Sequence, residues 1–397
     1  MWIRWSPIQI RPAQPHLSTS PLGQAMTRHS VPVARIFGIS IGLDYSWFLI
    51  FVLFTWALAS SYYPAAYPTW SRGTYWIMGA ITALMLFVCV LLHELGHSVV
   101  AMRYQIPVRS ITLFIFGGVS QIEGEPHSAA AEFWIAIAGP VVSGALAAGF
   151  ALLRPIVAAV GPLLALTTYL AYINGALAVF NLIPGFPLDG GRVLRAILWS
   201  SIHSLRKATL AAATVGRFIG FVFILWGVAQ IFAGQLGNGL WIAFIGWFLE
   251  NAASAQVQQQ VIGSLLAGHT ASEAMNPHYV STPAATRLQD LVDRHILGSG
   301  SRAVVVTRDD EPVGLVTVHQ IAAVPRDRWP ISTVTDAMTP ITSVKRIKPT
   351  TGLWEAMTEM DHDGVNQLPV TEDSRIVGML TRADVISYLR TLQELGR

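Results

Sequence analysis

Hydrophobic residues divide the chain into two unequal parts. Between about residues 43 and 253, apolar residues form long runs that charged residues rarely interrupt, whereas from about residue 270 onward charged residues return at ordinary density. A run of about 20 apolar residues is long enough to cross the hydrocarbon core of a bilayer. The pattern therefore predicts a membrane domain followed by a soluble domain.

Six apolar runs predict membrane-spanning helices, of which the last two are short and interrupted by glycine. They cover residues 44–62, 75–98, 132–153, 161–183, 216–233 and 238–252. Loops on the cytoplasmic side of a membrane carry an excess of Lys and Arg. Basic residues precede the first run, follow the second and separate the fourth from the fifth, while the opposite side carries only Arg72 and Arg154. We therefore expect a cell-membrane protein with six spans and both termini in the cytoplasm.

The second part of the chain contains an internal repeat. The segment SEAMNP at 272–277 recurs as TDAMTP at 335–340, and RAVVVTRDDEPVGLVT at 302–317 recurs as NQLPVTEDSRIVGMLT at 366–381. Each copy is typical of a helix, two short strands and a second helix. The predicted organisation is a tail, a membrane domain, a helical linker and two repeats, at residues 1–30, 31–255, 256–268, 269–326 and 332–392.

Composition agrees with a membrane protein and excludes some functions. The chain is 52% hydrophobic and only 12% charged, whereas soluble domains contain about a quarter charged residues. Net charge is only +3 and the sequence has no basic patch, which argues against nucleic acid as a partner. A single cysteine, Cys89, excludes an intrachain disulfide. The first 25 residues lack the apolar core of a signal peptide, and they are interpreted either as disordered or as lying before a working start at Met26.

The most unusual polar residues lie in LLHELGHSVV, residues 91–100, at the end of the second apolar run. On a helix, His93 and His97 share one face, so both imidazoles can bind one metal ion with Glu94 beside it. About 18 apolar residues precede His93, which corresponds to roughly 27 Å of helix. The cluster is therefore expected near the cytosolic end of the hydrocarbon layer, where ionisable residues usually mark a functional site.

A third ligand is expected from another part of the chain, because catalytic zinc takes three protein ligands. The segment NLIPGFPLDGGR, 181–192, ends the fourth run at a similar depth. Its prolines break a helix, and irregular backbone at this depth is tolerated only where it lines protein or a water-filled cavity. We therefore expect this segment to bend and to present Asp189 to the histidines. The alternative is that Asp189 only belongs to a turn leading to Arg192.

Taken together, HELGH in one span and NLIPGFPLDGGR in another resemble the site-2 protease family of intramembrane zinc metalloproteases. FGGVSQIEGEP at 116–126 and EFWIAIAGP at 132–140 also resemble that family, and the likeness covers roughly residues 30–250. The resemblance implies one Zn²⁺ per chain, with His93, His97 and Asp189 as ligands and Glu94 as general base. It also implies that Asn181 helps to hold the substrate carbonyl or oxyanion.

An apolar, β-prone segment with a Gly-Gly break, ITLFIFGGVSQIE at 111–123, predicts a hairpin or re-entrant loop near the site. In the family, similar segments clamp the substrate, and an exposed strand edge can hold a peptide extended. Simple loop packing is the alternative.

The repeat resembles paired cystathionine-β-synthase (CBS) domains, which often bind ATP, ADP or AMP between the two copies. Thr381 and Asp384 match positions that those domains use for phosphate and ribose, but the first copy has Gln320 in place of Asp384. The alternative is a structural pair, or one that forms a homodimer, without a ligand.

The predicted fold class is thus a multi-pass α-helical membrane domain of about six helices with a small membrane-associated β-hairpin, followed by a soluble α/β tandem CBS domain. The predicted function is intramembrane proteolysis of single-span membrane proteins, with anti-sigma factors among the substrates that the resemblance implies. Two alternatives are a CBS-gated transporter or channel with the histidines as an ion site, and a non-catalytic scaffold.

Overall fold

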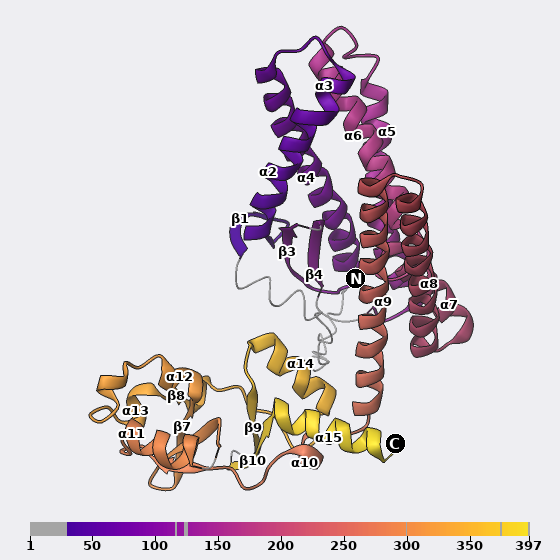
Figure 1. The fold of residues 1–397 in the computed structure, drawn as a ribbon. Coiled ribbons are helices and arrows are strands. Elements are labelled where there is room, and N and C mark those ends of the chain that lie inside the picture. The colour runs from indigo at the N-terminus through magenta and orange to yellow at the C-terminus, as the bar shows by residue number, and fades with distance from the viewer. Residues whose placement is uncertain (1–29, 116, 123–125, 299, 374, 396–397) are drawn as a thin grey trace, which may run out of the picture. The chain divides into compact units, whose positions relative to one another are not determined.

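The computed structural model separates into two compact units, residues 1–261 and 262–397, each of which is described by itself. It describes residues 30–115, 117–122, 126–298, 300–373 and 375–395 (Figure 1). The predicted N-terminal tail lies outside these residues, apart from Ser30.

Among the described residues, five helices of the first unit are long and apolar enough to cross a membrane. The first runs from Tyr45 to Ala66 and consists of α2 (Tyr45–Ala57), a π-helical turn (Leu58–Tyr62) and α3 (Tyr63–Ala66). The other four are α4 (Arg72–Arg103), α5 (Ala129–Leu153), α6 (Gly161–Asn181) and α8 (Leu205–Phe232). A shorter helix, α7 (Asp189–Ile202), lies between α6 and α8.

The sixth predicted span, 238–252, is not among these five helices. It lies within α9 (Leu236–Leu266), a helix of 31 residues. Asn238, Glu250 and Asn251 reduce the hydropathy of this part of the chain. Five of the about six predicted spans are therefore found, and the sixth stays a prediction. The expectation that the last run continues as a helical linker agrees with the length of α9.

A sheet of four strands in the order β1-β2-β3-β4 belongs to the same unit. Its strands are β1 (Ser30–Ile36), β2 (Ile39–Asp44), β3 (Val108–Phe114) and β4 (Gly117–Ile122). β2 and β3 run parallel, and the other two pairs are antiparallel. The predicted hairpin is therefore confirmed as β3 and β4, but the sequence did not predict that β1 and β2 would extend it.

The sheet packs against α4, beside which Figure 1 shows β3 and β4. Ile39 of β2, Ile111 of β3 and Leu95 of α4 form one buried cluster. Leu95 lies between the two histidines of α4 in the sequence, so the sheet supports the part of that helix that carries the polar cluster.

Glycines allow two of the long helices to approach closely. A Cβ atom on Gly220 of α8 would lie 2.8 Å from the carbonyl oxygen of Gly246 on α9, and one on Gly227 would lie 2.6 Å from that of Gly239. Small residues of this kind are typical of helix packing in membranes, where close van der Waals contact replaces the hydrophobic effect.

In the described part of the second unit, each repeat forms one hairpin. The first repeat has β5 (Ser281–Pro283), α11 (Leu288–Leu291), β6 (Ala303–Arg308), β7 (Glu311–Thr317) and α12 (Val318–Ala322). The second has α14 (Leu353–Asp363), β9 (Gln367–Glu372), β10 (Arg375–Thr381) and α15 (Arg382–Glu394). This order of helix, two strands and helix agrees with the prediction.

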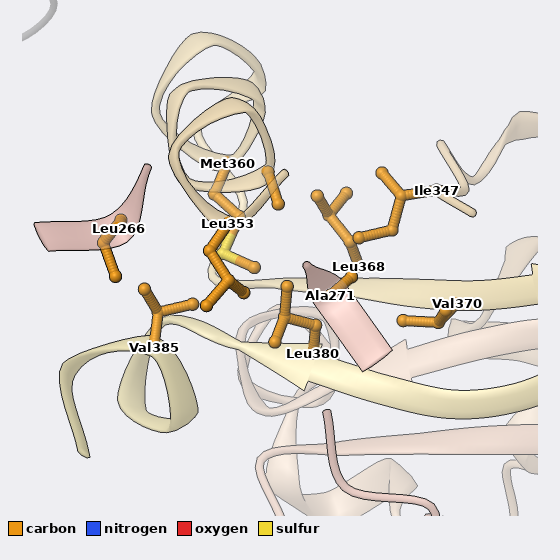
Figure 2. Close-up of a cluster of buried hydrophobic side chains, with 10 residues drawn as sticks. Leu266, Ala271, Ile347, Leu353, Met360, Leu368, Val370, Leu380 and Val385 are labelled. Atoms are coloured by element: carbon orange, nitrogen blue, oxygen red, sulfur yellow. The ribbon is translucent and has the colours of Figure 1, made fainter. Parts of the chain in front are cut away.

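The two repeats exchange their first segments. Ala271 of α10 (Ala271–Ala274) lies in the core of the second repeat, with Leu353, Leu380 and Val385 (Figure 2). Conversely, α13 (Val334–Ala337) contributes Val334 to the core of the first repeat, and β8 (Thr339–Pro340) pairs with β7. Each core therefore requires residues from both copies, so the pair folds as one unit.

Candidate metal centre

Two buried imidazoles and a carboxylate converge at the end of α4. His93 and His97 are 5% and 4% exposed, and their Nε2 atoms lie 3.2 Å apart. Asp189, the first residue of α7, places Oδ2 3.2 Å from each Nε2 atom. The three donor atoms all lie within 4.8 Å of one another. The structure therefore brings together the three residues that the sequence predicted as a ligand set.

The segment before Asp189 bends as predicted. α6 ends at Asn181, and residues 182–188 form turns that lead into α7. Glycines permit this path: a Cβ atom on Gly190 or Gly191 would overlap the backbone of residues 182–186. On the other side, a Cβ atom on Gly185 would lie 2.6 Å from the Cα atom of Gly216 in α8. The backbone is thus packed so closely that larger residues at these positions would displace Asp189.

The two imidazoles next to Asp189 favour the ionised form of its carboxyl group. Burial alone raises its pKa, but the neighbouring His93 and His97 outweigh burial and lower it. An ionised carboxylate next to two imidazoles is a donor set typical of a catalytic zinc site.

The space beside the imidazoles fits a metal ion only because α5 has a glycine there. A Cβ atom on Gly139 would overlap Nε2 of His97 and would lie 2.6 Å from Nε2 of His93. These are the nitrogen atoms that face Asp189, so the residues present fit a bound zinc ion.

The other ring nitrogen of each histidine has a partner on α5. Nδ1 of His93 lies 2.9 Å from Oγ of Ser143, and Nδ1 of His97 lies 2.7 Å from the carbonyl oxygen of Ile135. A histidine that donates from Nδ1 has Nε2 available as a metal ligand. The sequence analysis did not find these partners, because a serine and a backbone carbonyl within an apolar helix give no sequence signal.

Glu94 lies beside this cluster and contacts the sheet. Its Oε2 accepts a hydrogen bond of 2.7 Å from Oγ of Ser120 on β4. A Cβ atom on Gly118 would lie 3.1 Å from the carboxyl carbon of Glu94, so the β4 backbone passes directly over the glutamate. The described hydrogen bonds of Glu94 thus connect the edge strand to the helix that carries the histidines.

Asn181 is less closely connected to the cluster. It is the last residue of α6 and is partly buried. In the described part of the chain, no hydrogen bond joins its side chain to the three donor residues, so its predicted contact with the substrate stays a prediction.

Thr381 and Asp384 form a helix capping box at the start of α15. The backbone N–H of Thr381 donates to Oδ2 of Asp384 at 2.9 Å, and that of Asp384 donates to Oγ1 of Thr381 at 3.2 Å. Thr317 and Gln320 form the same arrangement at the start of α12. Capping therefore explains why either residue type serves at this position, and a role in ligand binding remains a separate prediction.

Comparison with known proteins identifies the family. A model described as Peptidase family M50 matches residues 81–160 and 155–226, and a CBS domain model matches 271–327 and 334–391. Zinc metalloprotease Rip3 of Mycobacterium tuberculosis is 37% identical over 363 residues, which cover 90% of this chain and 92% of that protein. The chain belongs to peptidase family M50. Zinc metalloprotease sll0528 of Synechocystis is also similar, at 35% identity over 94% of this chain and 99% of that protein.

Among solved structures, the chain is similar to the site-2 protease from Methanocaldococcus jannaschii. The match has 28% identity and a TM-score of 0.40, and it covers 57% of this chain and 95% of that one. The two family models and the curated relatives confirm the predicted resemblance to site-2 proteases with a CBS pair. Membership of the M50 peptidases favours hydrolysis over the alternative of a CBS-gated transporter.

If the space at Gly139 is needed for a metal ion, a single methyl group there will prevent binding. We expect Gly139→Ala to lower the zinc content of the purified protein severely, because the new Cβ atom overlaps the ligand nitrogens. Gly144→Ala on the same helix is the matched control, since a Cβ atom there meets nothing within 4 Å. Metal analysis by mass spectrometry gives the result, and equal zinc in both variants would show that the metal lies elsewhere.

Proposed function

We propose that this M50 peptidase is an intramembrane zinc metalloendopeptidase that cleaves membrane-spanning segments of other proteins. The observation that carries the proposal is the convergence of His93, His97 and Asp189 beside Glu94, at the end of an apolar helix that is long enough to cross a bilayer. Both relatives are named as zinc metalloproteases, and these names support zinc as the metal.

Zinc bound to this donor set would polarise the scissile carbonyl and would lower the pKa of a bound water to about 7. Glu94 is placed next to the donors and can take up the proton of the attacking water, then pass it to the leaving amine. Ser120 donates to one oxygen of Glu94 and so fixes the orientation of the carboxylate. Asn181, at the end of α6, would hold the substrate carbonyl from the other side.

The sheet supplies a place for an unwound substrate. β4 is the last strand in the order β1-β2-β3-β4, and Ser120 connects it to Glu94. An extended peptide can add to such an edge through backbone hydrogen bonds. This would carry the scissile bond past Glu94, in agreement with the clamp role that the family resemblance implies. Single-span membrane proteins, with anti-sigma factors as one class, are the proposed substrates.

The proposed topology places both termini and the metal centre on the cytosolic side of the cell membrane. α9 then serves as a sixth crossing, because the part from Leu236 onward is helical and exposes Leu240, Trp241 and Trp247. Aromatic residues of this kind suit a position next to lipid.

The CBS pair is proposed to bind ATP, ADP or AMP and to report the nucleotide state to the protease. A ligand shifts activity only if it binds two protease states with different affinity, and a coupling of 1–3 kcal/mol corresponds to roughly 5–150-fold. Dimerisation through this unit is the alternative role.

Replacing the proposed base without changing its shape separates metal binding from catalysis. We expect Glu94→Gln to retain zinc and to lose activity by about 10²–10⁴-fold, because the amide cannot accept the proton. Asp189→Asn, in contrast, should lose zinc. Membrane proteomes of cells with wild-type and Glu94→Gln protein would show the uncut substrates, and near-normal cleavage by Glu94→Gln would contradict the assigned role.

Cysteine labelling tests the topology, and the native Cys89 does not interfere because it is buried. We expect Ser201→Cys, on an exposed position of α7, to react with an impermeant thiol reagent only from the cytosolic side. Ala158→Cys, in the exposed loop between α5 and α6, should react only from outside. The reverse pattern would invert the proposed orientation.

The capping boxes suggest how to test nucleotide binding without damaging α15. Asp384→Gln should keep the cap, since Gln320 serves as a cap in the first repeat, but it removes the carboxylate that would contact ribose. Loss of a hydrogen bond to a charged group costs about 1.5–3 kcal/mol, so binding should weaken by about 10- to 150-fold. Calorimetry of the full chain measures the nucleotide affinity. Gln320→Glu, which changes the corresponding cap of the first repeat, is the control. Absence of binding at millimolar ATP, ADP and AMP would leave dimerisation as the role of the pair.

A further inference from the structure

One face of α5 contacts His93 and His97 directly and also contacts α7, the helix that begins at Asp189. α5 itself provides no metal donor. The residues are Glu132, Ile135, Gly139 and Ser143, whose spacing of three or four places them on the same side of a helix. All four are buried, and Glu132, Ile135 and Ser143 have no exposed surface. The face is therefore enclosed by protein along its whole length.

At one end of this face, Ser143 sets the orientation of His93. The distance of 2.9 Å from Nδ1 of His93 to Oγ of Ser143 is that of a hydrogen bond, and both groups are buried. With Ser143 accepting from Nδ1, the ring presents Nε2 to Asp189. About two helical turns away, the carbonyl oxygen of Ile135 does the same for His97.

At the other end, Glu132 holds the helix that carries Asp189. Its Oε1 accepts a hydrogen bond of 2.6 Å from Nε of Arg195 and a second from the same guanidinium group. Nε of Arg192 lies 4.0 Å from the same oxygen. Both arginines belong to α7, which begins at Asp189, so this ion pair joins the start of α5 to the helix of the carboxylate ligand.

Arg195 also contacts the turn before Asp189. Its guanidinium carbon lies 5.3 Å from the ring centroid of Phe186, which is 5% exposed. A cation over an aromatic face is attracted to the ring. Glu132 therefore holds Arg195, and Arg195 contacts the turn before Asp189 through Phe186 and belongs to the helix after it.

Stability alone does not account for this ion pair. The desolvation penalty of a buried pair often exceeds its Coulombic gain, and apolar residues of similar volume are often equally stable. Moreover, Oε2 of Glu132 is buried without a hydrogen-bond partner among the described residues, which adds to the cost of burial. A fixed geometry is what the pair provides and an apolar contact does not.

We propose that Glu132 and Ser143 are positioning residues for the metal centre: Ser143 acts through His93, and Glu132 acts through Arg195 on Asp189. This inference rests on the proposed function, because it assumes that the three donors bind zinc. Neither residue contacts the reacting atoms, so the effect of replacing them is expected first in metal affinity.

Two variants test the proposal in the full, detergent-purified chain. Ser143→Ala removes one hydroxyl, and the double variant Glu132→Leu, Arg195→Met replaces the ion pair by apolar side chains of similar size. Loss of an outer partner of a metal ligand typically weakens binding or activity by about 10- to 100-fold, and we expect this loss in zinc affinity measured by chelator competition. The melting temperature of the metal-free protein should stay close to that of the wild type.

Two controls come from the same domain, a buried hydroxyl and an ion pair that is more exposed than the one between Glu132 and Arg195. Thr209→Val removes a fully buried hydroxyl that donates within α8, and Glu250→Leu with Arg217→Met removes the ion pair between α8 and α9. Both should leave zinc affinity unchanged. Ser143→Thr, which keeps the hydroxyl, should recover part of the affinity that Ser143→Ala loses.

The outcomes separate this inference from the proposed function. Unchanged zinc affinity in Ser143→Ala and in the double variant would overturn the inference, even if the wild type cleaves its substrates. The inference would also be overturned if the metal-free Ser143→Ala and double variants melted well below the metal-free wild type and Ser143→Thr recovered no zinc affinity. The residues would then be structural. Zinc affinity that falls as expected in a chain without protease activity would support the inference and contradict the proposed function. A wild-type chain that binds no zinc would overturn both.

Discussion

The membrane domain depends on one constraint: two imidazoles and a carboxylate must meet inside an apolar helix bundle, where a buried polar atom without a partner is costly. The structure meets this constraint through close backbone approach. Gly139 leaves room beside the Nε2 atoms of His93 and His97, and Gly190 and Gly191 let the turn before α7 fold back so that Asp189 reaches them. A side chain at any of these glycines would separate the donors.

The four elements around the centre have different tasks. α4 provides both histidines and Glu94, α7 provides Asp189, and β4 contacts Glu94 through Ser120. α5 provides no donor, but Ser143 and the carbonyl of Ile135 orient the imidazoles and Glu132 holds α7 through Arg195. The metal ligands are thus held rigidly by α5, while the proposed substrate has access along the edge strand β4.

Local sequence patterns predicted two parts of the site: the residues that share a helix and the segment that interrupts one. His93 and His97 follow from helical spacing, and the bend before Asp189 follows from Pro184, Pro187 and the glycines. The supports on α5 could not be predicted in this way, because their partners are about 40 to 60 residues away and a lone serine or carbonyl has no pattern. β1 and β2 were missed for a similar reason, since β2 pairs with a strand that follows α4. The sixth predicted span lies in α9, where polar residues interrupt the apolar run, and it stays a prediction. Thr381 with Asp384 forms a cap that the first repeat builds with Gln320.

The measurement that tests the central claim most directly is zinc-edge X-ray absorption of the purified chain, combined with the anomalous signal of zinc in crystals. We predict one zinc per chain with two nitrogen ligands and carboxylate oxygen at about 2.0–2.2 Å, and an anomalous peak between Nε2 of His93, Nε2 of His97 and Oδ2 of Asp189. A sulfur ligand, a peak at any other group of residues, or no zinc in active protein would contradict the account.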